Sequence, residues 1–442
     1  MSNINLDISD FGPINQANIE LKKLNVIAGV NGSGKTTSSK LLYCFLTSNS
    51  DEKEYLTNMS INRRIRSTIS SLLDEFKLES GMELENYFEL RRLDNELLLK
   101  SIDATPNAQF NERINSLKKI VNESQIKNKE AYLEKINTIE CALEINSIEH
   151  RQFFEVSNSL LNSEFRIKDL KLENPDVQFY GKQDDCEFLC KLDYNESKLG
   201  AIIDRGDLNS INIKNIIYID SPSIFNSKSI NESIILKNQP FHLRFLSRIL
   251  KTPIDNDDVY DEVFNQKLDH FKDKIAELIG GFIFYDEAKE EFFFKKGENI
   301  YSMENTASGI KQLGIIQMLL SNRTLTENSF LIMDEPEVNL HPEWQIKLAQ
   351  ILVLIAKELN VTSYINTHSP FLAEAIEVHA KYYKIYDETN FYLTEKVKDE
   401  EKYDYILMQS NDISEVYENL GNPFDTLNNI RFETELRDDL GE

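Results

Sequence analysis

The chain has 442 residues, of which 41% are hydrophobic. This allows a full apolar core, in one large domain or in two to three domains of roughly 150 residues each. No stretch approaches the roughly 18 uncharged apolar residues of a membrane span, and the N-terminus carries acid where a signal peptide carries base. We therefore predict a cytoplasmic protein with no membrane association.

The charge balance argues against a protein that binds DNA tightly by itself. The 49 basic and 74 acidic residues give a net charge of −25, which repels a phosphate backbone unless basic residues cluster locally. A basic protein partner, or a basic groove formed only on assembly, fits this charge better. The four cysteines are too few and too scattered for a disulfide framework or a zinc site.

The first 50 residues predict an α/β arrangement. Two strand-like stretches, "INLDISDF" and "ANIELKKLNVIAG", precede a glycine-rich turn, and a helix is predicted to begin near Lys35. From residue 51 to 171 the pattern changes to helical apolar spacing with almost no Gly or Pro. We predict a helical insertion there, either an antiparallel helical arm or an ordinary packed helical lobe.

Strands and helices alternate in the rest of the chain. Strands are predicted at "VQFYGKQ", "CEFLCKL" and "NIIYIDSP", a helix over 260–278, and a meander over 281–303. The final alternation is helix 309–321, strand 329–334, helix 342–359, strand 361–367 and a helix from about Pro370. It predicts a parallel sheet with helices on its faces.

The stretch "LNVIAGVNGSGKTTSSKLL" carries the phosphate-binding pattern G-x-x-x-x-G-K-[ST] between a strand and a helix. The backbone N–H groups of such a loop converge on phosphate oxygens, and the helix N-terminus adds positive potential. Lys35 is predicted to reach the β and γ phosphates, and Thr36 to ligate Mg²⁺.

Two further segments predict residues at the same edge of the sheet. The apolar strand in "SFLIMDEPEVNLHPEWQ" ends at Asp334 and Glu335, and the strand in "INTHSP" ends at His368. Asp334 is predicted to hold Mg²⁺ through water, Glu335 to orient or activate the attacking water, and His368 to contact the γ-phosphate or that water.

A fourth segment, "NTASGIKQLGIIQMLL", places Ser308 and Gly309 at a helix start. Such a pair is ordinarily an N-cap, and the same geometry also makes an anion site. It lies too far along the chain to belong obviously to the phosphate loop of its own subunit.

These four segments, in this order, resemble the ABC-type ATPase heads of the SMC, Rad50, RecF and overcoming-lysogenization-defect class. The resemblance covers roughly residues 1–48 and 210–380. It makes Glu335, His368 and Lys35 catalytic, Thr36 and Asp334 the metal ligands, and residues 337–341 the D-loop; Gln178 and Gln183 are candidates for the Q-loop. It assigns nucleotide binding to Gly29, Asn31, Gly32, Ser33, Gly34, Lys35, Thr36, Thr37, Ser308 and Gly309.

The resemblance implies an α/β P-loop NTPase of the ABC-ATPase head type, with a mostly parallel sheet, an antiparallel β subdomain and a large α-helical insertion. The expected domains are an N-terminal lobe (1–50), the helical insertion (51–171), a C-terminal lobe (172–380) and a partner-docking extension (381–442). ATP and Mg²⁺ are the implied cofactors. Two copies are expected to close over ATP, with Ser308 of one subunit capping the γ-phosphate held by Lys35 of the other.

Size and layout are similar to ATPase subunits of bacterial antiphage systems, above all the Septu type, which assembles with a separate HNH nuclease, and next the PARIS type, with a toprim effector. Built-in nuclease activity is not expected, because no D-x-D cluster follows His368. Contact with nucleic acid is expected through the complex.

A RecF-like repair ATPase acting on DNA ends and a non-enzymatic ATP-binding scaffold are the alternatives. A repair ATPase needs a basic groove, for which Arg63–Arg66 and Arg91–Arg92 are the candidates, and the acidic tail 432–442 is either a docking segment or a solvated end.

Overall fold

The computed structural model describes most of the chain. The residues that it describes are 3–50, 53–78, 84–99, 107–124, 126, 128–144, 149–165, 175–183, 186–195, 198–206, 208, 211, 213–220, 224–225, 239–251, 262–397, 405–410, 414–416 and 430–431. The acidic tail 432–442 lies outside them, as do the side chains of Arg63 and Arg64.

Eleven of the described strands form one mixed sheet, with the order β6-β5-β4-β1-β2-β14-β13-β3-β12-β11-β7. Their bounds are β1 (Asn3–Phe11), β2 (Ile14–Leu21), β3 (Leu24–Ala28), β4 (Asp176–Gln183), β5 (Cys186–Asn195), β6 (Lys198–Arg205), β7 (Asn215–Ile219), β11 (Ser329–Asp334), β12 (Thr362–Thr367), β13 (Thr389–Lys396) and β14 (Tyr405–Ser410).

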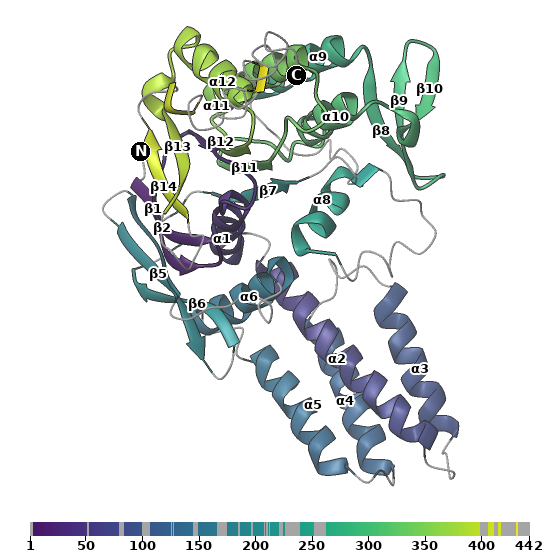
Figure 1. The fold of residues 1–442 in the computed structure, drawn as a ribbon. Coiled ribbons are helices and arrows are strands. Elements are labelled where there is room, and N and C mark those ends of the chain that lie inside the picture. Colours follow the sequence, from purple (N-terminus) through teal and green to yellow (C-terminus); the bar gives the residue numbers. More distant parts are fainter. Residues whose placement is uncertain are drawn as a thin grey trace, which may run out of the picture. The chain divides into compact units, whose positions relative to one another are not determined.

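One half of this sheet is parallel. Neighbouring strands run in the same direction from β7 through β11, β12 and β3 to β13. Every residue of β3 and β11 is buried, as continuous apolar strands between two helical layers require. Helix α1 (Lys35–Ser48) lies on one face of these strands, and α11 (Pro342–Glu358) and α12 (Pro370–Tyr382) lie on the other (Figure 1). The predicted α/β fold is confirmed, and the carboxyl ends of the parallel strands share one edge.

The other half of the sheet is mostly antiparallel. β1 pairs with β2 on one side and with β4 on the other, and β4 pairs with β5, all antiparallel. β14 joins the two halves, because it is antiparallel to β13 and parallel to β2. The range 381–442, predicted as an extension, thus contributes β13 and β14 to the sheet, and β13 lies directly beside the strand that leads into the P-loop.

Further helices and a small sheet complete this part of the chain. The helices are α8 (Phe241–Lys251), α9 (Glu262–Ile279) and α10 (Ser308–Ser321), and the predicted meander is the antiparallel sheet of β8 (Phe282–Asp286), β9 (Glu291–Lys296) and β10 (Asn299–Ser302). Gly314 lets α10 approach β8 closely, because a Cβ there would lie 1.8 Å from the Ile283 side chain. Among the helices in the described ranges, none combines the length and apolar composition that crossing a bilayer requires.

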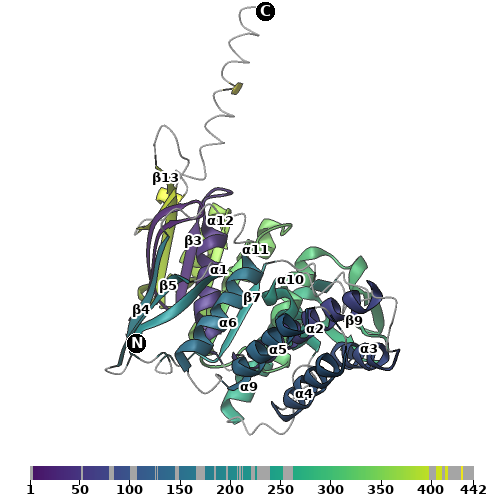
Figure 2. The ribbon, with the colours of Figure 1, turned by 90° about the horizontal axis from the view of Figure 1, so that it is seen from below.

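The chain divides into two compact units. The first comprises Met1–Leu46, Ser163–Leu192 and Asp204–Glu442, and the second comprises Thr47–Asn162 and Asp193–Ile203. In the second unit, four helices share one apolar core, whose residues include Ile69, Leu90, Leu117 and Ile136. They are α2 (Lys53–Leu78), α3 (Leu84–Leu99), α4 (Asn107–Glu123) and α5 (Lys129–Glu144), and α6 (Glu149–Glu164) follows them. These four helices lie side by side (Figure 2) and share one core, so of the two alternatives for the insertion the packed lobe fits better than the antiparallel arm.

Candidate active site

The glycine-rich loop joins the end of β3 to the start of α1. Gly32 and Gly34 have positive φ values, 75° and 95°, which explains why glycine occupies these positions. A Cβ at Gly32 would have no atom within 4 Å, whereas one at Gly34 would lie 2.4 Å from the Ile14 side chain. The Ile14 side chain of β2 therefore packs against the loop at Gly34, whereas the loop is open at Gly32. Asn31 is exposed, and the Ser33 hydroxyl donates to the Val30 carbonyl at 2.7 Å.

The Lys35 ammonium lies in the centre of this loop. It donates to the carbonyl oxygens of Gly29 and Val30 at 2.9 and 2.7 Å, and lies 3.1 Å from Nδ1 of His368. Burial lowers the pKa of Lys35 to about 8, although the nearby charges of Glu335, Asp334 and Glu337 favour its protonated form. Two N–H bonds of the ammonium thus have carbonyl acceptors in the loop. The His368 Nδ1 accepts the third only when that ring nitrogen carries no proton.

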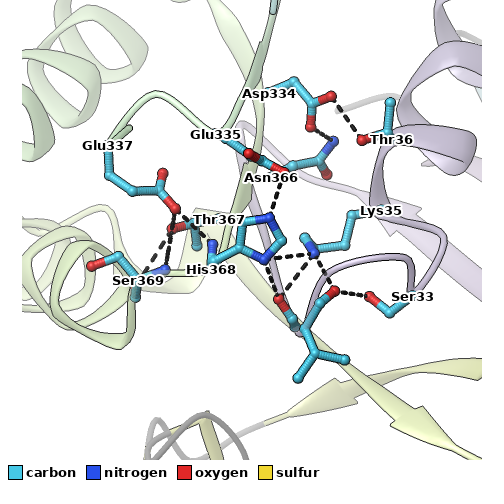
Figure 3. A network of polar contacts seen from close by, with 12 residues as sticks. Ser33, Lys35, Thr36, Asp334, Glu335, Glu337, Asn366, Thr367, His368 and Ser369 are labelled. Carbon is cyan, nitrogen blue, oxygen red and sulfur yellow. Dashed lines mark hydrogen bonds and ion pairs between the residues drawn. The ribbon is translucent and has the colours of Figure 1, made fainter. Parts of the chain in front are cut away.

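The Asp334 carboxylate lies at the end of β11 beside the start of α1. Its Oδ2 accepts a hydrogen bond from the Thr36 hydroxyl at 2.8 Å and one from Tyr218 at 3.3 Å. Its Oδ1 accepts from the Asn366 amide at 2.8 Å, and the same amide nitrogen lies 2.9 Å from the Ser39 hydroxyl. Three strand ends and one helix therefore fix the two predicted metal ligands next to each other (Figure 3).

These residues fit a nucleotide with Mg²⁺. A hydroxyl and a carboxylate at hydrogen-bonding distance are a donor set that Mg²⁺ takes up together with phosphate oxygens and water. In the described part of the chain, no group of three or more His, Cys, Asp or Glu residues forms a cage for a metal. Thr36 and Asp334 would supply part of the ligand shell of a metal here, and phosphate oxygens and water would supply the rest. Bound Mg²⁺ would offset the negative charge that develops on the phosphates during hydrolysis.

The ring of His368 lies between Lys35 and Glu335 (Figure 3). Its Nε2 contacts the Glu335 carboxylate, and its Nδ1 lies 2.7 Å from the Gly29 carbonyl oxygen. When Nε2 carries the only ring proton, it donates to Glu335 while Nδ1 accepts from Lys35. The Glu335 backbone is held at φ 52°, and its N–H donates to the Asn366 carbonyl at 3.0 Å. The carboxylate is thus aimed at the phosphate loop from a conformation that costs free energy for a non-glycine residue.

Ser308 and Gly309 begin α10 and lie against the D-loop. The N-cap Ala307 makes no side-chain capping bond, and the Ser308 hydroxyl donates to the Asn339 carbonyl of the D-loop at 3.0 Å. A Cβ at Gly309 would lie 3.1 Å from both Leu340 and Trp344. In the described ranges no hydrogen bond joins either residue to the P-loop.

The structure does not bring the Q-loop candidates to this site. Gln178 and Gln183 belong to β4, which is separated from β3 by β1, β2, β14 and β13. Gln178 instead bonds to Asp176 on the same strand, at 3.1 and 3.2 Å. Thr37 lies on the first turn of α1 beside Gly12.

A buried ionic cluster near the site was not predicted. His242 on α8 contacts Glu164 Oε2 through Nδ1 at 2.5 Å and Asp220 Oδ2 through Nε2 at 3.0 Å. Asp220 directly follows β7, and the His242 ring packs on Tyr218, with ring centroids 4.7 Å apart. No short motif joins these residues, since 78 positions separate His242 from Glu164. The cluster thus links α8 to the tyrosine that bonds Asp334.

Substituting Gly29 by alanine tests the close approach of the loop to β13. A Cβ at this position would lie 1.8 Å from the Thr394 hydroxyl oxygen, so we expect a loss of about 1–3 kcal/mol in unfolding free energy from overpacking. The double variant Gly29→Ala with Thr394→Ala removes two of the three nearest atoms, the hydroxyl oxygen and the methyl carbon of Thr394, and should recover part of that loss. Urea unfolding of the two single variants and the double variant measures this. Additive losses would contradict the predicted clash.

Comparison with known proteins gives the family. The model of the AAA ATPase domain family matches residues 1–373. No curated protein matches the chain.

Several solved structures resemble the chain at low identity. The SMC head domain from Thermotoga maritima is 10% identical, with 93% of this chain and 99% of that chain covered and a TM-score of 0.39. The Smc head domain derived from Pyrococcus furiosus, with an extended coiled coil and bound to the C-terminal domain of ScpA, is 12% identical, with 98% and 100% covered and a TM-score of 0.39. An ATP-binding cassette of an ABC transporter in its ADP conformation is 11% identical, with 96% of both chains covered and a TM-score of 0.34.

A family match over most of the chain agrees with a P-loop, an acidic pair and a histidine that converge on one edge of a parallel sheet. The chain belongs to the AAA ATPase domain family and is an ATPase.

Proposed function

We propose that the chain binds ATP with Mg²⁺ in the site described above and hydrolyses it slowly as a regulatory switch. The roles follow the geometry: Lys35 and the loop N–H groups hold the phosphates, Thr36 and Asp334 hold the metal, and Glu335 activates water with His368 beside it. The observation that carries this proposal is the contact of the Glu335 carboxylate with His368, whose other ring nitrogen lies 3.1 Å from Lys35. A base is thereby held at the place where a terminal phosphate meets water.

We further propose that two copies close over the nucleotide, each completing the other's pocket. The separation of Ser308 from its own P-loop supports this arrangement, as do two exposed apolar side chains beside the site. Val30 in the P-loop is 38% exposed, and Val338 in the D-loop is 48% exposed. Hydrolysis removes the bridging charge and loosens the pair, so that turnover becomes a conformational switch.

The dimer is tested with the Glu335→Gln variant, which should retain ATP. Native mass spectrometry should show a dimer with ATP and Mg²⁺ and a monomer without them. Adding Ser308→Ala should weaken the dimer at least about tenfold, as the loss of a hydrogen bond to a charged group implies. Ser321→Ala is the matched control, because Ser321 lies at the other end of α10 and its hydroxyl donates to the Gln317 carbonyl of the same helix at 2.9 Å. A dimer that is insensitive to ATP and to Ser308 would refute the sandwich.

The biological role that we propose is control of a separate nuclease in antiphage defence, in the cytoplasm, with an HNH nuclease as the favoured partner. This part rests on the resemblance in size and layout and on the net charge of −25, which suits a basic partner. Purification of the protein from its own host, followed by native mass spectrometry, tests it. Co-purification of a nuclease at fixed stoichiometry is expected, and a complex that lacks one would contradict the proposal.

A DNA-repair ATPase is the second candidate, and the helical lobe gives it little support. Arg66 pairs with Asp94 at 3.1 Å, and the Arg91 Nε donates to Tyr87 at 3.2 Å. Two of the candidate arginines therefore already contact partners within the lobe. A salt titration of the purified protein with duplex ends decides the question, since direct phosphate contacts make affinity fall steeply with salt.

A further inference from the structure

Glu337 is a buried carboxylate in the turn between β11 and α11. Only 7% of the residue is exposed, and in the described part of the chain no ion pair joins it to a Lys or Arg. Its Oε1 accepts three hydrogen bonds instead: from the Thr367 hydroxyl at 2.7 Å, the His368 N–H at 2.6 Å and the Ser369 N–H at 3.1 Å. All three donors belong to the end of β12 and the turn that follows it (Figure 3).

This arrangement fixes the point from which the His368 ring projects. Glu337 reaches across from the end of β11 and holds the His368 N–H, while the Glu335 N–H is held by the Asn366 carbonyl at 3.0 Å in the opposite direction. The two strand ends are thus tied by bonds in both directions. Because these four hydrogen bonds join the end of β11 to the end of β12 and its turn, the histidine and the carboxylate that it contacts keep one relative position.

The same turn also reaches the start of α10. Two residues beyond Glu337, Asn339 has φ 62° and offers its carbonyl to the Ser308 hydroxyl at 3.0 Å. The next residue, Leu340, packs closely against Gly309: a Cβ added at Gly309 would lie 3.1 Å from the Leu340 side chain. A displacement of the His368 turn therefore has a short, continuous route through Glu337 and Asn339 to Ser308.

We propose that Glu337 is a positioning residue that holds His368 against Glu335 and Lys35 and couples this histidine to Ser308 through the turn that ends at Asn339. The positioning part stands on the contacts within one subunit. The coupling part rests on the proposed function, in which Ser308 completes the pocket of a second copy. Under that arrangement, nucleotide bound in one pocket sets the position of Ser308 in the pocket of the second copy. The change in nucleotide affinity is then the same in both directions.

The positioning part is tested by comparing Glu337→Gln with Glu337→Ala. Glutamine keeps an acceptor oxygen in place of Oε1, whereas alanine leaves three donors without it. We expect alanine to lower kcat for ATP about 10- to 100-fold with little change in KM, and glutamine to restore most of kcat. Glu343→Ala is the control, because this exposed acid lies nearby on the first turn of α11 and pairs with Lys347 at 2.9 Å.

Two results would overturn the positioning role. One is a kcat for Glu337→Ala within twofold of the wild type. The other is an equal loss with glutamine and alanine, which would assign the effect to the negative charge. If Glu337→Ala does not fold, Thr367→Val removes one of the three donors, together with the bond that the Thr367 hydroxyl accepts from the Ser369 N–H, and leaves the His368 and Ser369 N–H bonds to Glu337. Its kcat is then expected to fall less than tenfold with KM unchanged, and an unchanged kcat would count against the role.

The coupling part is tested by a double-mutant cycle of Glu337→Ala and Ser308→Ala, with kcat as the readout. We expect Ser308→Ala to cost at least about threefold less in the Glu337→Ala background than in the wild type, because the turn no longer transmits the state of His368. Additive losses would refute the coupling and leave the positioning role intact. If Ser308→Ala has no effect in the wild type, the sandwich itself fails, and the Glu337 single variants still decide the positioning role.

Discussion

The Glu335→Gln variant is expected to hydrolyse ATP at least about 100-fold more slowly than the wild type while it binds ATP equally well. Glutamine keeps the size of the side chain but takes no proton from water, and a positioned general base contributes about 10² to 10⁴ in rate. In the structure this carboxylate contacts Nε2 of His368 and has 38% of its side chain exposed, so it is accessible to water. Phosphate release measures turnover, and titration with a fluorescent ATP analogue measures binding.

Two further variants make this result specific. Lys35→Ala should reduce both turnover and affinity, the latter at least about tenfold, because it removes the charge that faces the phosphates. Glu343→Gln replaces an exposed acid on α11 and should change neither. Turnover of Glu335→Gln within a few-fold of the wild type would exclude Glu335 as the base, and unchanged affinity in Lys35→Ala would place the nucleotide elsewhere.

The second large effect is expected at the buried cluster of Glu164, His242 and Asp220. His242→Ala should lower the free energy of unfolding by about 3–5 kcal/mol, because it leaves buried carboxylate oxygens without their shared cationic partner. The side chains of Glu164 and His242 are fully buried, and that of Asp220 is 30% exposed. Urea unfolding at pH 7 measures the loss. Equal stability of the variant and the wild type would mean that the cluster contributes nothing.

The same cluster gives the wild type a definite pH dependence. Burial alone would lower the pKa of His242, but its hydrogen bonds to Asp220 and Glu164, together with their charges, outweigh burial and raise the pKa from 6.5 to about 9. The groups facing it from the neighbouring elements α1 and β7 are the phenol rings of Tyr43 and Tyr218. Because the folded pKa is the higher one, this contribution is fully present below pH 6.5 and is lost as the pH rises through about 9.

The size of this pH effect follows from the shift in the pKa of His242. The contribution amounts to about 3 kcal/mol on the acid side of the transition. Unfolding of the wild type between pH 6 and pH 10 should show this loss, and His242→Ala should not. His379→Gln is the control. Burial lowers the pKa of that histidine on α12, so removing it should leave the loss of stability between pH 6 and pH 10 in place. A wild-type profile that matches that of His242→Ala would contradict the assignment.

Much of the site could be predicted because its residues sit in short motifs at strand ends. Lys35, Asp334 and His368 follow three strands that the apolar pattern identifies, and parallel strands bring their carboxyl ends to one edge. The role of Glu337 escaped prediction, because its three partners lie at the end of the neighbouring strand β12 and in the turn after it, and no spacing reveals them. The His242 cluster escaped for the same reason, and α8, which carries it, had no recognised pattern.

The architecture around the site was less accessible to sequence reasoning. Helical periodicity in the insertion fitted an arm and a packed lobe equally well, because both bury one face of each helix. Only the shared core of four helices separates them. The placement of β13 beside β3 was also missed, since strand order depends on long-range pairing that a local apolar pattern does not record.

The strand order has a consequence for how the protein is made. Every residue of β3 is buried, yet this strand pairs only with β12 and β13, which the ribosome synthesises roughly 330 residues later. At about 5–20 residues per second, an apolar strand with two open edges waits roughly 20 to 70 s for its neighbours. A nascent chain of this kind is exposed to mispairing and aggregation. The protein is therefore expected to need a chaperone during translation, and its nucleotide pocket is completed only after β12 and β13 have been synthesised.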